Sequence, residues 1–273
     1  MSNKFNIELG YVQLTLLLPL WGRAIELKKQ SPALIDSKAA EIIEKIDYDF
    51  TKIANNIHPV TQFEWIARSI HIDRAIKNFL ENHPCGTIVN IGCGLDTTFE
   101  RVDNGKLHWY DLDFEDVIAL RRKFISENER RKFIASSFLN ESWFDEIYVE
   151  DSILFMAAGV FYYLEEKDLQ EIFKKLIPVF PNSEMIFDAA SPLGVKTANE
   201  KVIEGSGLDK RSHLKWGIQN ADEILEWNNK IELVNEIPMY KNMVDGLSQE
   251  NQLAAEMSDK YKIMYMIHLR FAK

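Results

Sequence analysis

Two glycines and one carboxylate, Gly92, Gly94 and Asp113, have the residue types and the spacing that bind a nucleoside. The glycines directly follow a short apolar run, Thr87–Ile91, where they allow a tight turn and let a ligand approach without a Cβ in the way. The acid follows by about 20 residues, the position at which nucleotide-binding α/β units hold ribose hydroxyls. A glycine pair alone also fits an ordinary strand-to-helix turn, so the prediction depends on the glycines and the acid together.

The residue at position 97 indicates which nucleoside to expect. A dinucleotide fingerprint requires a third glycine there, where helix and strand pack closely beside a pyrophosphate. This chain has Thr97. We therefore expect a ligand with a ribose and no phosphates, such as S-adenosylmethionine, and a nicotinamide oxidoreductase is the disfavoured alternative.

The elements that position these residues alternate between strands and helices. Thr87–Ile91 is β-branched at four of its five places, which predicts a buried strand, and a second strand, Leu107–Leu112, leads to Asp113. Further strands are expected over Lys132–Ser136, Asp151–Met156, Glu184–Asp188, Lys230–Glu236 and Tyr261–Phe271, and helices over Thr61–Asn82, Glu115–Glu127, Glu165–Ile177, Ala221–Trp227 and Asp245–Met257. The alternation predicts an α/β fold with a mainly parallel sheet.

Three segments carry a resemblance to a known family. They read IVNIGCGLDTTF at Ile88–Phe99, WYDLDFEDVI at Trp109–Ile118 and AGVFYYL at Ala158–Leu164. They resemble the leucine carboxyl methyltransferase family of S-adenosylmethionine-dependent enzymes, and within it the bacterial branch named for the tetracenomycin polyketide-synthesis O-methyltransferase. The similarity runs from about Leu17 through Trp216, most of the chain.

The resemblance implies a Rossmann-like class I methyltransferase fold, with a mostly parallel seven-stranded sheet and helices on both faces. We expect residues 1–273 to form a single domain, with a helical cap over 1–86 and an α/β core over 87–273. A stretch near 190–220, rich in glycine and polar residues, interrupts the alternation and predicts a substrate loop.

Arg68 interrupts an apolar face of a predicted helix. On the pattern alone it pairs with Glu64 on the helix surface, as Arg23 pairs with Glu26. In the family that the chain resembles, an arginine at the position of Arg68 grips the carboxylate of the cofactor's methionine part. A bidentate guanidinium suits that task.

Ser137, Phe138 and Ala158 are expected to contact the cofactor at the rim of the sheet. Ligands of open parallel sheets bind outside the carboxyl ends of the strands, and each of these residues follows a predicted strand. We expect the adenine near Ser137, where a hydroxyl or backbone group reads its amino edge and Phe138 packs on it. Ala158 leaves space for the ligand, and the resemblance implies that it replaces a glutamate of the protein-phosphatase-methylating members.

The sequence leaves the catalytic group unknown, with His213, Tyr162 and Tyr163 as candidates. A carboxylate acceptor, with a reference pKa near roughly 4, is ionised at neutral pH, whereas a phenol, near about 10, needs a base or a cation. No His/acid pair has a spacing that commits to base catalysis. We therefore expect a small-molecule carboxylate of polyketide or secondary-metabolite type, methylated to an ester. The alternatives are methylation of a phenol or other hydroxyl, and a non-catalytic S-adenosylmethionine-binding protein.

Charge and composition argue against several kinds of partner. The formal net charge of −10 disfavours binding of a nucleic acid, which needs clustered lysines and arginines. The two cysteines and six histidines have no metal-ligand spacing, so no metal is expected. The apolar stretch Leu14–Trp21 is too short to span a membrane and has no features of a leader peptide. We expect a cytoplasmic enzyme whose partner is a small molecule, and the oligomeric state is open.

Overall fold

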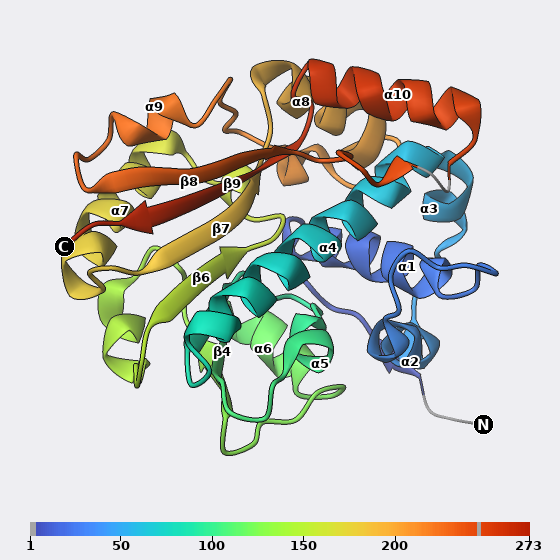
Figure 1. Ribbon diagram of the computed structural model, residues 1–273. Helices are drawn as coiled ribbons and strands as arrows, with labels where there is room; N and C mark the ends of the chain where they lie inside the picture. The colour runs from blue at the N-terminus through green and yellow to red at the C-terminus, as the bar shows by residue number, and fades with distance from the viewer. Residues whose placement is uncertain (1–3, 245–246) are drawn as a thin grey trace.

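A seven-stranded sheet forms the centre of the computed structural model, which describes residues 4–244 and 247–273 (Figure 1). Its strands are β3 (Thr87–Ile91), β4 (His108–Asp113), β5 (Arg131–Ala135), β6 (Ile153–Ala157), β7 (Glu184–Ala189), β8 (Ile231–Pro238) and β9 (Tyr265–Phe271). Their order in space is β5-β4-β3-β6-β7-β9-β8, with the pairs from β5 to β7 parallel. β9 runs antiparallel to both β7 and β8. This topology confirms the predicted Rossmann-like α/β fold and its antiparallel ending.

Helices cover both faces of the sheet (Figure 1). The helices are α1 (Leu17–Glu26), α2 (Ser37–Lys45), α3 (Thr51–Asn56), α4 (Pro59–Asn82), α5 (Thr98–Val102), α6 (Glu115–Arg121), α7 (Glu166–Val179), α8 (Pro192–Thr197), α9 (Asp222–Leu225) and α10 (Gln249–Lys260). Ile88 and Leu154 pack with α4, α5 and α10, whereas the adjacent Val89 and Phe155 pack with α7 and α9. Neighbouring strand residues point to opposite faces, so these strands are apolar throughout because both faces are buried.

The segment before the sheet is helical, as predicted. Asp36 caps α2, and its Oδ1 accepts a hydrogen bond from the backbone N of Ala39 at 2.9 Å. α4 has Pro59 at its first position and ends shortly before Pro84, because proline suits the first turn of a helix and breaks its interior. The two-residue strands β1 (Phe5–Asn6) and β2 (Ile46–Asp47) form a small parallel pair beside these helices.

The stretch near 190–220 that we predicted as a substrate loop is helical in its first half and irregular in most of its second half. Ser191 caps α8 by accepting a hydrogen bond from Gly194 N at 3.1 Å, and the chain continues into a π-helical turn over Ala198–Ile203. Ile203 and Leu214 are buried in the same apolar cluster as α4. The insertion is therefore a packed part of the molecule, although its glycines and polar residues indicated an irregular loop.

Helix α6 ends six residues earlier than predicted, at Arg121 rather than Glu127. The chain turns at that point and places Phe124 and Ile125 in an apolar cluster shared with α1 and α2. Burial of these two side chains outweighs the continuation of the helix, which the local sequence favoured.

The last strand, β9, begins at Tyr265 rather than at the predicted Tyr261. Lys262 has a φ of +48°, and this left-handed conformation interrupts an extended chain. The predicted start of the preceding helix, Asp245, lies outside the described residues. α10 itself begins at Gln249, where Ser248 caps it.

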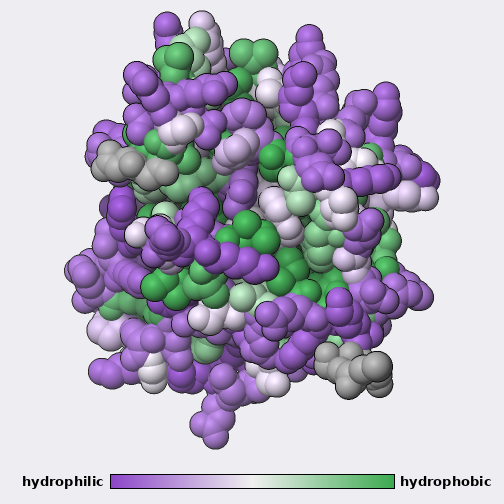
Figure 2. All heavy atoms as spheres, turned by 90° about the vertical axis from the view of Figure 1, so that its right-hand side faces the viewer, coloured by the Kyte–Doolittle hydropathy of each residue, from purple (hydrophilic) through white to green (hydrophobic). Residues whose placement is uncertain are grey.

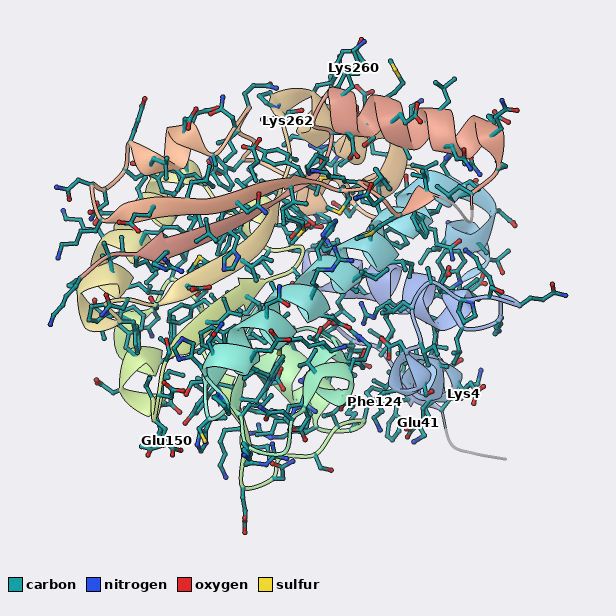
Figure 3. All side chains as sticks on the ribbon, viewed as in Figure 1. Lys4, Glu41, Phe124, Glu150, Lys260 and Lys262 are labelled. Atoms are coloured by element: carbon teal, nitrogen blue, oxygen red, sulfur yellow. The ribbon has the colours of Figure 1, made fainter. Side chains whose placement is uncertain are left out.

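Charged side chains lie around the outside of the molecule (Figure 3). Lys4 and Glu41 are found at the end that contains α2, and Lys260 and Lys262 near α10. Among the described residues, no three His, Cys, Asp or Glu side chains are grouped as metal ligands. None of the described helices is long and apolar enough to cross a membrane.

Candidate functional site

A cavity of about 470 Å³ opens at the carboxyl ends of the parallel strands. Five residues predicted to bind the cofactor line it: Gly92, Gly94, Asp113, Arg68 and Ala158. They meet because β3, β4 and β6 end at the same edge of the sheet, and the strand order reverses between β3 and β6, where open α/β sheets form their ligand crevice. On the face shown in Figure 2, hydrophobic side chains gather within a largely hydrophilic surface.

The turn after β3 requires its glycines. Gly92 and Gly94 have φ angles of +62° and +47°, in the left-handed region that other residues rarely adopt. A Cβ on Gly92 would lie 2.5 Å from Cγ2 of Val160, a contact too close for any side chain. Gly94 turns its backbone N toward Asp113 and donates to Oδ2 at 2.8 Å. The turn therefore brings backbone and carboxylate together at the wall of the cavity.

Asp113 lies half-buried at the cavity, and its second oxygen, Oδ1, accepts from Phe114 N at 2.8 Å. Burial raises the pKa of the Asp113 carboxyl to about 6, although these two backbone hydrogen bonds act to lower it. Asp111, two residues earlier, is fully buried and is bound by Arg131 Nε at 2.8 Å and Trp109 Nε1 at 2.9 Å. Of the two acids, only Asp113 lines the cavity.

Arg68 is buried, and its guanidinium hydrogen-bonds to other elements of the fold rather than to residues of its own helix. Its Nη1 donates to Asp188 Oδ2 at 2.8 Å and to the Tyr162 hydroxyl at 3.2 Å. Asp188 also accepts from Gly159 N at 2.7 Å, which ties the end of β7 to the segment after β6. The surface pair with Glu64 is thus wrong, because the guanidinium points to the end of β7. An arginine so held presents a fixed cation to the cavity.

A buried ionic network holds the turn after β3 against the N-terminal helices. Asp36 Oδ2 accepts from Arg23 Nε at 2.9 Å, Thr97 Oγ1 at 2.6 Å and Arg101 Nη1 at 2.8 Å. Arg101 in turn forms a two-pronged pair with Asp73 on α4. The predicted pairing of Arg23 with Glu26 is wrong, since Asp36 offers a buried carboxylate. Thr97, at the position of the missing third glycine, joins the turn to the start of α2.

Ser137, Phe138 and His213 do not line the cavity. Ser137 Oγ accepts from Leu139 N at 3.3 Å, and the Phe138 ring is buried and stacks on Phe161 at 5.4 Å. His213 places Nε2 at 3.2 Å from Glu204 Oε1, within the insertion. Their predicted roles stay predictions, and the described part of the cavity wall next to Asp113 contains Phe114 instead.

Tyr162 and Tyr163 both line the cavity. Burial raises the pKa of Tyr163 to about 12 and that of Tyr162 well above its usual value. Both phenols are therefore protonated at neutral pH, and the Tyr162 hydroxyl accepts a hydrogen bond from Arg68 Nη1.

Glu64 is an acidic group of the cavity for which the sequence predicted only a surface pair. It lies one turn before Arg68 on α4 and lines the cavity, and its Oε2 accepts from the Tyr240 hydroxyl at 3.3 Å. Burial raises the pKa of Glu64 to about 7, against the lowering effect of Arg68. The spacing of four from Arg68 marks a shared helix face, but nothing in the sequence indicates that this face borders the cavity.

Much of the remaining cavity wall is apolar, and part of it comes from the insertion. It contains Val202, Ile203 and Leu214, with Met264 from the segment before β9 and Leu18 from α1. Arg211 and Lys215 also line it and are exposed, each paired with an acid, Asp209 at 2.8 Å and Glu165 at 3.3 Å. An apolar chamber with charged groups at its margin suits a small, largely apolar molecule.

Residues 17–177 match the model of the family described as leucine carboxyl methyltransferase. The tetracenomycin polyketide synthesis O-methyltransferase of Streptomyces glaucescens is 31% identical over 216 residues, which cover 78% of each chain. An S-adenosyl-L-methionine-dependent methyltransferase of Gibberella zeae is 26% identical over 206 residues, covering 68% of this chain and 69% of its own. Among solved structures, a DUF574-family protein from Streptomyces avermitilis has a TM-score of 0.57 at 13% identity, covering 78% of this chain and 86% of its own. At that identity the likeness concerns the fold alone.

Proposed function

The chain belongs to the leucine carboxyl methyltransferase family and is an S-adenosylmethionine-dependent methyltransferase, and we propose that it methylates an oxygen atom of a small molecule held in the cavity. The cap and the α/β core act together as one domain in this proposal. One observation carries it: the glycine turn, Asp113 and Arg68 line the same cavity as a group of apolar side chains that includes Ile203 and Leu214.

The glycine turn, Asp113 and Arg68 fit the cofactor group by group. Gly92 has no room for a side chain, so backbone forms this part of the wall. Asp113 is the acceptor for the two ribose hydroxyls, and Arg68 is the cation for the methionine carboxylate. Both side chains are held by protein hydrogen bonds, Asp113 by Gly94 N and Arg68 by Asp188. Because these side chains are already fixed in the free protein, binding of the cofactor costs less conformational entropy.

Little further chemistry is asked of the protein, since the sulfonium of the cofactor supplies an activated methyl group. The chain contributes alignment of the acceptor oxygen with that methyl group, and exclusion of water from the chamber. Leu18, Ile203 and Leu214, all buried, provide the apolar surface for the second task.

The acceptor was predicted to be a carboxylate of polyketide or secondary-metabolite type. Two supports for it stand: a carboxylate needs no base, and the tetracenomycin relative is named for polyketide synthesis. A third, that the site offers no base, does not stand, because Glu64 lines the cavity. A hydroxyl acceptor is therefore the second candidate, favoured by Glu64.

A screen with methyl-labelled S-adenosylmethionine tests this function. Purified protein is incubated with a panel of aromatic acids and phenols, and the products are treated with mild alkali. Label in any acceptor supports methyl transfer, with esters releasing methanol and aryl ethers surviving. Cofactor binding without transfer to any member of a broad panel would favour the non-catalytic binding protein.

A further inference from the structure

Glu64 lies on the side of the cavity that faces away from the sheet. α4 runs antiparallel to the parallel strands, because its Phe79 sits at the start of β3, 2.5 Å from where a Gly86 Cβ would lie, and its Arg68 meets Asp188 near the end of β7. Glu64 precedes Arg68 by one helical turn, about 6 Å along the axis. It is therefore placed further beyond the strand ends than Arg68, the residue proposed to hold the cofactor carboxylate, and it still lines the cavity.

The surroundings of Glu64 are suited to a carboxyl that gains and loses a proton. The Tyr240 hydroxyl lies 3.3 Å from Glu64 Oε2 and 3.1 Å from the Val60 carbonyl, and it has one hydrogen for the two acceptors. If Glu64 is ionised, Tyr240 can donate to it; if Glu64 is protonated, Tyr240 can donate to Val60 and accept from Glu64. Both states of the carboxyl thus have a hydrogen-bond partner.

The charged groups around Glu64 come from three further elements. Arg68 on the same helix favours the carboxylate, whereas Asp188 on β7 opposes it, and Tyr162 and Tyr240 contribute neutral hydroxyls. With burial, these groups set the pKa of Glu64 at about 7, near the value at which a general base is most effective at neutral pH. Glu64 is not among the cofactor contacts proposed above.

We propose that Glu64 is the catalytic base and that the methyl acceptor is a hydroxyl group, a phenol or a comparably acidic alcohol, bound in the apolar chamber beside it. This inference rests on the proposed methyltransferase function and adds the acceptor class. The apolar wall formed by Ile203, Leu214 and Met264 suits an aromatic ring that carries such a hydroxyl.

The step balances in atoms and charge. The acceptor oxygen forms a bond to the methyl carbon while the bond from that carbon to sulfur breaks, and the electron pair of the broken bond stays on sulfur. The hydroxyl proton passes to the Glu64 carboxylate, and the sulfonium becomes a neutral thioether. Glu64 then returns the proton to water when the product leaves.

A carboxylate acceptor fits this corner of the cavity less well. It would place a second anion beside Glu64, since Asp188 is already paired with Arg68, and like charges at short range in a partly dry site oppose binding. A phenol brings no charge and offers the hydrogen that Glu64 can accept.

The first test measures Glu64 itself and needs no acceptor. Infrared difference spectra between wild type and Glu64→Gln, recorded with S-adenosylhomocysteine bound, should show a carboxyl that titrates near pH 7. Tyr240→Phe removes a hydrogen bond that lowers this pKa, so titration should move to higher pH. A carboxyl that titrates near its ordinary value of 4.5 would overturn the proposal.

The second test uses 2-naphthol and 2-naphthoate, which differ only in the acceptor group, with labelled S-adenosylmethionine. The wild type should methylate 2-naphthol to an alkali-stable ether, with a rate that rises with pH through about 7. Glu64→Gln should lower kcat at least about 100-fold, the usual contribution of a general base, with unchanged affinity for S-adenosylhomocysteine. Glu81→Gln, an exposed change at the other end of α4, is the matched control and should leave the rate unaltered.

Each outcome decides between the alternatives. Transfer to 2-naphthoate alone, full activity of Glu64→Gln on 2-naphthol, or no transfer to 2-naphthol by a wild type that binds S-adenosylhomocysteine would each refute the base. Loss of S-adenosylhomocysteine binding in the wild type would instead refute the proposed function. The two failures are therefore distinguishable.

Discussion

The part of the cavity wall that we assign to the cofactor, the cofactor end, and the part that we assign to the acceptor, the acceptor end, are built in different ways. At the cofactor end, the turn after β3 and Asp113 come from 22 consecutive positions, 92–113, and only Arg68 comes from a distant element, α4. The network of Asp36, Thr97 and Arg101 holds that turn. At the acceptor end, Glu64, Tyr240 and Leu214 come from α4, from the segment after β8 and from the insertion. The cofactor end is therefore mainly a local sequence motif supported by an ionic network. The acceptor end forms only when segments distant in the sequence have packed together.

This difference determines which residues at each end can be substituted without loss of the fold. The cofactor contacts that we propose depend on a fixed turn and two charged side chains. The acceptor end consists mostly of side chains on the insertion, which can be exchanged without disturbing the sheet. Changes at the two ends should therefore alter different quantities, and the predictions below test that separation.

The largest effect is expected at Asp111, which belongs to the fold and not to the cavity. Asp111→Ala leaves the buried guanidinium of Arg121 without its carboxylate and removes one of the two carboxylates bound by Arg131, and breaking a buried ion pair costs about 3–5 kcal/mol. Urea denaturation should show a loss of this size. Asp113→Ala should instead stay folded and bind S-adenosylhomocysteine at least about tenfold more weakly, the loss of one charge-assisted hydrogen bond or more. If the two variants exchange these behaviours, the assignment of the ribose contact is wrong.

Arg68 should show the next effect, on cofactor affinity. Arg68→Ala removes the cation and is expected to weaken binding of S-adenosylhomocysteine by roughly 10- to 100-fold, the worth of a hydrogen bond between charged groups. Arg68→Lys keeps the charge but loses the fork, so its affinity should lie between those of Arg68→Ala and the wild type. Calorimetric titration of the three proteins checks this order. An unchanged affinity together with a lowered melting temperature would show that Arg68 only supports Asp188.

The sequence predicted that the glycine turn and Asp113 lie together, because these signals are local. Gly92, Gly94 and Asp113 have a spacing that follows from strand, turn and strand lengths, and all three line the cavity. The partners of Arg23 and Arg68 were mispredicted, because Asp36 and Asp188 are brought to them by packing and not by helical spacing. A nearby acid in the sequence is a poor guide when a buried one is available in the fold.

For the acceptor end, the sequence predicted only the approximate stretch of chain and not its structure, because that end is formed by contacts between distant segments. The insertion looked irregular because glycine and polar residues are frequent in loops, whereas its apolar residues find partners only against α4 and the segment before β9. Glu64 seemed a surface residue, since the sequence does not show which side of α4 borders the cavity. Its separation from Tyr240 is 176 positions, beyond any local pattern.

The raised pKa of Glu64 should appear as a smaller effect on stability. The pKa is about 7 in the folded protein and 4.5 is the ordinary value, so the folded state holds the proton more tightly. Stability attributable to the neutral carboxyl is therefore fully present below about pH 4.5 and is lost as the pH rises through 7. Glu64→Gln stays neutral, and its melting temperature should exceed that of the wild type at pH 8 and match it near pH 4.5. A lower melting temperature at pH 8 would contradict the raised pKa.

The smallest effect is expected from the insertion. Val202→Ala removes half-buried apolar surface from the chamber and should raise the KM for the acceptor a few-fold, since each buried methylene contributes about 0.8 kcal/mol. Affinity for S-adenosylhomocysteine should be unchanged, because Val202 is not among the proposed cofactor contacts. Parallel measurement of KM and cofactor affinity checks this separation. Equal changes in both would mean that the two ends of the cavity are not independent.

The central claim is that the turn after β3 and Asp113 bind S-adenosylmethionine and not a dinucleotide. Isothermal titration of wild type and Asp113→Ala with S-adenosylhomocysteine and with NAD tests it directly. The account predicts that S-adenosylhomocysteine binds the wild type, that Asp113→Ala weakens this binding at least about tenfold, and that NAD gives no heat above background. Binding of NAD more tightly than S-adenosylhomocysteine, or equal affinity of the two proteins for S-adenosylhomocysteine, would contradict it.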